Sequence, residues 1–227
     1  MIPSLSGAVA NLSASDPYWS SVTCMIQFYT ESKDYKNNHT ITLNGGAALS
    51  TSIVKFGTKA LDCTTATMWA SISGDSTEDF NPRAQDFTYE AWMYFTGTLT
   101  VSWKIWGDDA AIVDYLNVIV DTTHAHIVWH PNGDVVEFNP SVVLPSGSWH
   151  HIAHTRSGNT QYIFIDGIQQ TSRENSSNVG AASVGWGLFG DFSVRITTGY
   201  IDSFRVTKGV ARYTGDFSVP TAAFPRR

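Results

Sequence analysis

Short strand-like segments about ten residues apart run along nearly the whole chain, and this spacing narrows the possible folds most. The segments are rich in β-branched and aromatic residues, and Gly, Ser, Thr and Asn gather between them. No segment has a convincing helical period, and no internal repeat is visible. Strands at this spacing indicate a two-sheet antiparallel sandwich, which 227 residues can form as one domain.

Residues 87–96 are the clearest strand, because aromatic and β-branched side chains dominate them. Asp166-Gly167 stands between two strand-like runs and predicts a two-residue hairpin, since both turn positions need positive φ. Residues 100–138 predict a meander. The other predicted strands are 22–29, 39–43, 47–52, 59–63, 68–71, 100–106, 112–120, 125–129, 135–138, 149–156, 161–165, 168–171, 185–189 and 200–207.

The last predicted strand, 200–207, has Tyr200, Asp202, Phe204 and Val206 on one face at period 2. Phe204 and Val206 mark that face as the core side. An unpaired carboxylate among apolar neighbours is costly, so Asp202 is expected to have a partner. The segment that follows predicts an extended tail whose aromatic rings lie on the finished body.

Several stretches together carry a resemblance to a known family. They are GYIDSFRVTKGVARY with the following PTAAFP, DPY at 16–18, FGTKAL at 56–61, FTYEAWMYF at 87–95, WHHIAHTRSG at 149–158 and FIDG at 164–167. They resemble laminin-G-like, concanavalin A-type jelly-roll domains, especially those of phage tail and virion proteins and of bacterial surface proteins. The resemblance implies an all-β, two-sheet antiparallel jelly-roll sandwich. The resemblance covers about residues 16–225, so we expect one laminin-G-like domain with an extended tail at 16–227, while the composition of residues 1–15 predicts an N-terminal arm.

The function that the resemblance implies is a non-catalytic virion protein, a capsid decoration or a tail-associated adhesion protein that touches host surface glycans. Two alternatives use the same scaffold: a glycoside hydrolase or polysaccharide lyase, and a secreted bacterial lectin. Laminarinase-type hydrolases of this fold carry E-x-D-x-x-E or E-x-D-x-E on one strand. This chain has no such motif, and Glu90 is the lone carboxylate of its strand, so we expect no catalysis.

The charge of the chain disfavours two classes of partner. The net charge is −6, and no basic run precedes Arg226-Arg227, so nucleic acid and anionic membranes are poor candidates. No apolar stretch is long enough to cross a membrane. Residues 1–15 contain no Lys or Arg and no apolar core, so we expect no signal peptide and a location in the virion after synthesis in the host cytoplasm.

Aromatic residues beside carboxylates are the candidate ligand site. Trp106 precedes Asp108 and Asp109, and Trp186 lies in a glycine-rich stretch, so both rings are predicted to face outward from loops at the sandwich rim. Rings beside carboxylates bind sugars through stacking and polar orientation. The alternative is that these tryptophans are buried, as large aromatic residues commonly are.

Calcium is the candidate cofactor. Relatives of the fold bind a structural ion near an aspartate placed like Asp202, and Asp34 resembles the aspartate of a D-x-S-G turn, although Lys36 and Asn37 replace its Ser and Gly. The alternative for Asp202 is a hydrogen bond to backbone amides or to an arginine. His124, His126 and His130 share a strand face, which favours a polar outward face over a metal site.

Assembly contacts are expected at the two ends of the chain. Ile2, Leu5, Val9 and Leu12 recur along the arm and predict ordering on other virion proteins or on further copies of this chain. Phe217 and Phe224 of the tail are predicted to join these contacts. Cys24 and Cys63 lie in predicted strands, where buried free thiols are favoured and a disulfide stays open.

Overall fold

The computed structural model describes residues 15–37, 39–65, 67–73, 77–96, 103–108, 115–120, 125–130, 136–138, 146–176, 186–190 and 198–227. Its elements are η1 Trp19–Ser21, β1 Val22–Gln27, β2 Lys33–Asp34, β3 Thr40–Asn44, β4 Ala48–Ser50, β5 Ala60–Cys63, β6 Trp69–Ser73, η2 Thr77–Phe80, β7 Phe87–Phe95, β8 Trp103–Asp108, β9 Tyr115–Val120, β10 Ala125–His130, β11 Val136–Phe138, β12 Trp149–Ser157, β13 Thr160–Ile165, β14 Ile168–Glu174, β15 Trp186–Leu188 and β16 Gly199–Lys208. No described helix is long and apolar enough to span a membrane.

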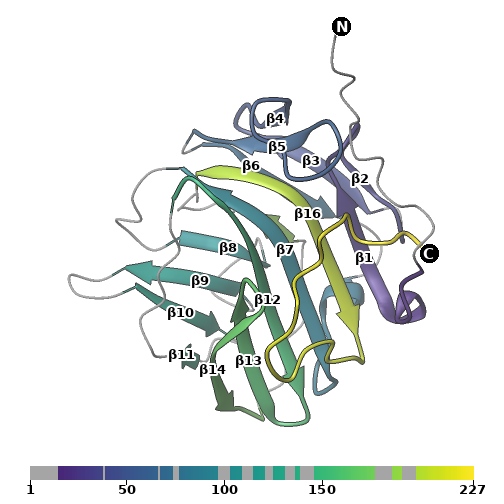
Figure 1. Cartoon of the computed structure of the whole chain (residues 1–227), viewed down its shortest axis with the longest axis vertical. Helices are drawn as coiled ribbons and strands as arrows, with labels where there is room; N and C mark the ends of the chain where they lie inside the picture. The colour runs from purple at the N-terminus through teal and green to yellow at the C-terminus, as the bar shows by residue number, and fades with distance from the viewer. Residues whose placement is uncertain are drawn as a thin grey trace, which may run out of the picture.

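Two antiparallel sheets form the body (Figure 1). The first sheet has the order β14-β13-β12-β7-β16-β1-β2, with β5 paired to β16 and β4 paired to β5. The second sheet has the order β11-β10-β9-β8-β15-β6-β3. The run β8 to β11 is the predicted meander, and the two sheets confirm the predicted sandwich.

The core lies between the sheets and contains both tryptophans that were predicted to face outward. Trp106 and Trp186 are fully buried. Trp186 stacks on Tyr89 with ring centroids 5.1 Å apart, and Trp106 packs on Phe204 at 5.9 Å. A β-bulge between Lys104 and Trp106 turns the Trp106 ring inward. The outward placement of both rings was therefore wrong.

A second β-bulge, between Ile201 and Ser203 of β16, corrects the predicted face of the last strand. Ile201 is in the core, whereas Tyr200 pairs with Tyr94 on the opposite face. The extra residue of the bulge shifts the alternation, so Phe204 and Val206 also point to the core. Asp202 lies within the bulge and is fully buried.

The segment 209–227 runs over the outer face of the first sheet, in front of β12, β7 and β16 (Figure 1). Phe217 stacks on Tyr213 with centroids 3.6 Å apart, and its N–H donates to the Gly167 carbonyl at 2.9 Å. Phe224 is 2% exposed and packs with Val22, Met25 and Trp92. The predicted docking of tail rings on the body is therefore correct.

The burial of Phe224 within its own chain is incompatible with the assembly contact that was predicted for this side chain. Phe217 is partly buried, and its assembly role stays a prediction. The arm residues Ile2, Leu5, Val9 and Leu12 lie outside the described residues.

Two further details agree with the sequence. Asp166 and Gly167 have φ values of 51° and 80°, as a two-residue hairpin with positive φ at both positions requires. Cys24 and Cys63 are both buried and free, so the reading that favoured free thiols is correct.

Candidate functional site

A row of aromatic side chains crosses the outer face of the first sheet beyond the edge of the tail. Trp149 of β12, Tyr94 of β7 and Tyr200 of β16 are direct cross-strand neighbours, and Tyr200 is in turn opposite Asp62 of β5. The ring centroids are 5.7 Å apart for Tyr94 and Trp149, and 6.0 Å apart for Tyr94 and Tyr200. We call Trp149, Tyr94 and Tyr200 the aromatic row.

The sequence builds this row because β7 carries aromatic side chains on both faces. Met93 and Phe95 are buried in the core, so the alternation of the strand directs Tyr94 to the outer face. Tyr94 and Trp149 are partly exposed, whereas Tyr200 is 7% exposed. Three neighbouring strands place the rings along about 10 Å, since adjacent strands are about 4.8 Å apart.

Polar groups flank the aromatic row at one end. The Asp62 carboxylate is partly exposed, and its Oδ1 accepts hydrogen bonds from the Thr64 N–H and hydroxyl at 2.9 and 2.8 Å. Burial and the nearby Asp62 carboxylate raise the pKa of Tyr200, so its hydroxyl stays protonated as a donor. A flat row of rings with a carboxylate and hydroxyls at its end can stack a sugar and orient its hydroxyl groups.

Glu90, the carboxylate weighed for catalysis, is buried beneath the tail. It contacts Arg205 at 2.7 Å, accepts a hydrogen bond from Tyr213 at 3.0 Å, and lies 3.1 Å from His151 Nε2. Burial alone would raise the pKa of Glu90, but Arg205 and His151 outweigh it and hold that pKa well below its usual range. Glu90 is thus a fixed anion inside the protein, with no exposed surface for a substrate.

Arg205 links the Glu90 cluster to the N-terminal end of the domain. Its guanidinium lies 2.8 Å from Asp16, which also contacts Arg212 at 2.8 Å. Arg205 additionally lies 4.2 Å from the centre of the Phe224 ring. Side chains from β7, β12, β16, the tail and the segment before η1 therefore meet in one buried ion network.

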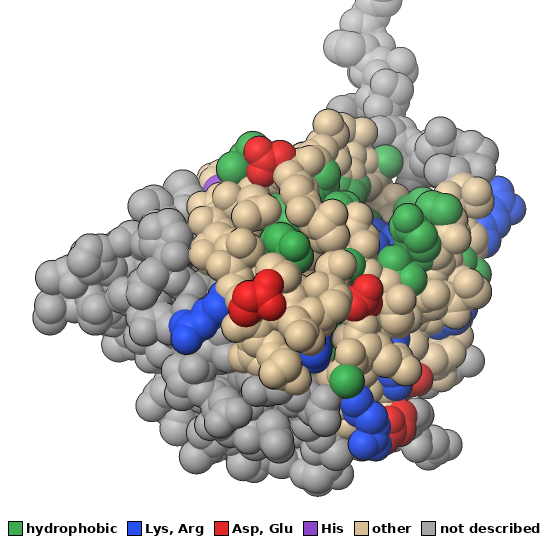
Figure 2. Space-filling model, turned by 90° about the horizontal axis from the view of Figure 1, so that it is seen from below, with side chains coloured by type: hydrophobic (Ala, Val, Ile, Leu, Met, Phe, Trp, Pro, Cys, Tyr) green, Lys and Arg blue, Asp and Glu red, His purple; other side chains and the backbone are tan. Residues whose placement is uncertain are grey.

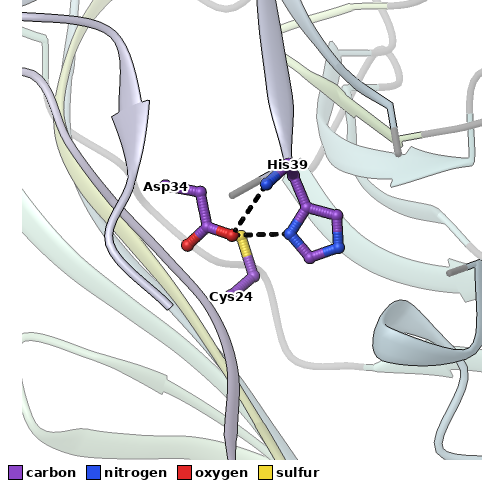
Figure 3. Close-up of side chains that lie close together, drawn as sticks. All are labelled: Cys24, Asp34 and His39. Carbon is purple, nitrogen blue, oxygen red and sulfur yellow. Dashed lines mark hydrogen bonds and ion pairs between the residues drawn. The ribbon is translucent and has the colours of Figure 1, made fainter. Parts of the chain in front are cut away.

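A second buried cluster contains Cys24, Asp34 and His39 (Figure 3). One donor atom from each lies within 4.8 Å of the others. His39 Nδ1 is 2.6 Å from Asp34 Oδ2, and His39 Nε2 is 3.2 Å from Asp79. His39 thus links Asp34 of β2 to Asp79 of the short helix η2.

This cluster does not fit a metal ion. The Asp34 oxygens already accept backbone hydrogen bonds from Met25, Lys36, Asn37 and His39, at 2.8 to 3.2 Å. With the His39 ring they use every lone pair of the carboxylate. Two ligands of one zinc ion are separated by about 3.3 Å, given bonds of about 2.0 Å, so the 2.6 Å contact is a hydrogen bond. Calcium at Asp34, as predicted from the resemblance, is disfavoured for the same reason.

Asp202 has a different environment. Its Oδ2 accepts hydrogen bonds from the N–H groups of Lys55 and Phe56 at 3.2 and 2.8 Å. The sequence predicted a partner for the Asp202 carboxylate, and these backbone amides are that partner. Its Oδ1, the Tyr29 hydroxyl and the Ser203 hydroxyl are all buried, and the Tyr29 hydroxyl lies close enough to Asp202 and Ser203 to interact with both. Burial raises the pKa of Asp202 to about 7, although the two amides oppose this rise.

We propose calcium as a ligand of Asp202, because Asp202 Oδ1 and Ser203 Oγ are buried oxygen donors of the kind that calcium prefers, with the Tyr29 hydroxyl beside them. These two residues would hold the ion. Asp202 and Asp34 share no hydrogen-bond partner among the described contacts, so they do not form one site.

Added calcium is expected to raise the melting temperature of the protein by about 2–8 °C, because an ion that binds only the folded state stabilises it. Asp202→Asn should abolish this response, whereas Asp62→Asn should keep it. Differential scanning calorimetry with calcium, magnesium or a chelator measures the effect. An unchanged melting temperature in calcium would leave Asp202 with its backbone partners alone.

The structure also places the remaining predicted site residues. Asp108 belongs to β8, where its backbone pairs with Trp186, while its side chain and Asp109 lie outside the described part. His124 and the side chains of His126 and His130 are likewise outside it. The sequence analysis missed Trp149, Tyr94 and Tyr200. The available signal was the pair Trp92 and Tyr94, which alternation places on the face opposite Met93.

Charges on one face of the molecule are dispersed. In Figure 2 the described acidic and basic side chains stand singly or in small groups of mixed sign among uncharged surface. This face therefore has no basic stripe in its described part.

The comparisons with known proteins agree with this architecture. The sequence profile of the concanavalin A-like lectin/glucanases superfamily, in its laminin G form, matches residues 64–211. The chain belongs to this superfamily. A comparison with curated protein sequences found no significant match.

Solved structures share the superfamily fold at low sequence identity. Domain 4 of AbnA, a GH43 extracellular arabinanase from Geobacillus stearothermophilus solved in complex with arabinotriose, is 16% identical with a TM-score of 0.65. The match covers 84% of this superfamily member and 94% of that domain.

Botulinum neurotoxin binding domains are also similar. One from the C/D mosaic serotype is 10% identical with a TM-score of 0.63, and the match covers 88% of this chain and 49% of that chain. A structure of the type C toxin, whose cell entry depends on interaction with two ganglioside molecules, is 11% identical with a TM-score of 0.65, and the match covers 85% of this chain and 49% of that chain. This superfamily member thus spans about half the length of the toxin chains.

Proposed function

We propose that the protein is a non-catalytic glycan-binding protein of a virion, and that the aromatic row is its binding site. The observation that carries this proposal is the alignment of Trp149, Tyr94 and Tyr200 on three adjacent strands, with the Asp62 carboxylate at the end. Rings on a rigid sheet are held in place before binding, which lowers the entropy lost when a sugar stacks on them.

Two further observations support the proposal. The arabinanase domain was solved with arabinotriose, and the type C toxin interacts with gangliosides, so the fold binds saccharides in other proteins. In this chain Glu90 is enclosed by the tail, and the strand lacks the second carboxylate of a hydrolase motif. The virion setting, as capsid decoration or tail-associated protein, rests on the motifs of the C-terminal segment, and mass spectrometry of purified particles tests it.

Trp149→Ala and Tyr94→Ala are each expected to weaken glycan binding about tenfold or more, because each removes a stacking surface. Tyr162→Ala is the matched control, since Tyr162 is a partly exposed aromatic residue of β13 outside the row. A glycan array selects the ligand, and isothermal titration calorimetry then measures the affinity of each variant. Equal affinities for all three variants would place the binding site elsewhere.

The competing function is a glycosidase or lyase on the same scaffold. An assay of new reducing ends and unsaturated products, on the glycans that the array selects, separates the two functions. Turnover that disappears in Glu90→Gln would overturn the non-catalytic proposal.

A further inference from the structure

Four cations outside the buried ion network of Arg205 and Arg212 lie over aromatic rings at the outer face of the first sheet or its β2 edge. Lys55 Nζ lies 4.1 Å from the centre of the Trp92 ring, the Arg226 guanidinium 3.6 Å from Tyr35, and Lys36 Nζ 4.7 Å from Trp19. Lys33 Nζ lies 5.6 Å from the centre of the same Tyr35 ring. We call Lys33, Lys36, Lys55 and Arg226 the cation track.

The cation track begins beside the aromatic row. The Phe56 ring meets the Trp92 ring edge-on at 5.7 Å, and both pack in the same outer-face cluster as Trp149. From Lys55 the track continues to Arg226, whose guanidinium is also 5.9 Å from the centre of the Tyr29 ring. Row and track therefore form one surface on the same side of the sheet.

Two cations of the track are held by a hydrogen bond in addition to the ring contact. Lys36 Nζ donates a hydrogen bond to the Trp19 carbonyl at 2.7 Å, and Arg226 Nε donates to Gln27. Each side chain that is already ordered loses less entropy when an anion binds. Lysine and arginine retain further N–H donors after one hydrogen bond, and these can bind an anion.

The exposed charge along the track is mainly basic, unlike that of the whole chain. The chain has 14 Lys and Arg against 20 Asp and Glu, yet four of those 14 cations lie in this track. The nearby carboxylates Asp34 and Asp202 are fully buried and bonded to backbone amides. The acids with exposed surface are Glu31 beside Tyr35 and Asp62 at the end of the aromatic row, two against the four cations. Such a surface attracts anions and disfavours cations.

We propose that the ligand of the aromatic row is an acidic polysaccharide. Its sugar rings lie on the row, and the carboxylates of neighbouring sugar units contact the cation track. The proposal rests on the proposed glycan-binding function and adds the charge class of the ligand. A neutral glycan would use the row and leave the track without a role.

Calorimetry with three acidic polymers tests the charge class: polygalacturonate, alginate and hyaluronate, each paired with its carboxyl-reduced neutral form. Wild type should bind at least one acidic polymer tightly and its neutral form about 10- to 100-fold more weakly. The triple variant Lys33→Gln, Lys36→Gln, Lys55→Gln should lose a similar factor for the acidic polymer alone. Its affinity should also depend less on salt concentration than that of wild type.

The matched control is the triple variant Arg83→Gln, Arg173→Gln, Lys208→Gln, which removes the same charge from other parts of the first sheet and its loops. It should bind like wild type, and thermal melts confirm that both triple variants are folded. Equal binding of acidic and neutral forms, or unchanged affinity in the track variant, would overturn the acidic ligand. If Trp149→Ala loses binding to neutral and acidic polymers alike, the aromatic row is still supported as the glycan site even when the acidic ligand is not. The two proposals can therefore fail separately.

Discussion

Arg205→Met is expected to lower the free energy of unfolding by about 3–5 kcal/mol, because it leaves Glu90 buried without its main cation. Both side chains are nearly inaccessible, with relative exposures of 4% and 0%. Removing one partner of such a pair is far more damaging than removing a surface pair, since the remaining charge stays desolvated. The same change also removes the contact to Asp16.

Arg83→Met provides the matched control. Its partner Glu78 is 2.5 Å away, but the two side chains are 61% and 50% exposed, so water screens the pair and the variant should unfold almost like wild type. Urea unfolding followed by tryptophan fluorescence measures both variants. Similar losses in the two variants would mean that the buried network contributes no more than an exposed ion pair.

The buried network also predicts a dependence on pH. Arg205 and the other partners hold the pKa of Glu90 below its unfolded value, so its contribution to stability is present above about pH 4.5 and is lost as the pH falls. Wild type should therefore lose stability between about pH 5 and pH 2 more steeply than Arg205→Met. If the free energy of unfolding of both proteins falls in parallel with pH, the Arg205–Glu90 pair is not the cause of the pH dependence.

Gly167→Ala is expected to destabilise the protein by about 2–4 kcal/mol and to loosen the tail. An added Cβ would lie 2.1 Å from the Phe217 carbonyl oxygen, and the backbone φ of 80° is unfavourable for alanine. To relieve the clash, the tail must give up the hydrogen bond from the Phe217 N–H to the Gly167 carbonyl.

Gly158→Ala separates the two causes, because Gly158 has a φ of 59° but no atom within 4 Å of the added Cβ. It should cost about 1–2 kcal/mol, the penalty of the left-handed backbone alone. Limited trypsin digestion reports on the tail, because a loosened tail exposes Arg212, which contacts Asp16 and Thr207 in the intact protein. Equal stability and equal digestion of the two variants would show that the close contact of the tail with Gly167 does not affect stability.

Much of the fold could be predicted from the sequence, because each strand of a two-sided sandwich alternates in a regular way. The segment Phe87–Phe95 and the turn at Asp166-Gly167 are examples. The β-bulges could not be predicted, since one extra residue reverses the alternation without changing the composition. Because of the bulge before Trp106, its ring lies in the core, and because of the bulge at Asp202, Tyr200 lies on the outer face.

The candidate site was harder to predict because it depends on what covers the sheet. Alternation alone places Trp92, Glu90 and Tyr94 on the same face. Only the path of the tail decides that Glu90 is enclosed and that Tyr94 stays accessible. That path is set by contacts such as Gln27 to the Phe224 carbonyl, 197 positions apart in the sequence, which no local pattern reports.

The position of β16 in the first sheet governs the order in which the protein can fold. Its neighbours are β7 on one side and β1 and β5 on the other, so these strands cannot share a sheet until β16 has entered between them. The contact of Arg205 with Asp16 closes a loop of 189 positions. Such non-local pairing slows folding, and partly folded chains expose unpaired strand edges until the pairing is complete. We therefore expect refolding in seconds rather than milliseconds, and aggregation as its main competing reaction.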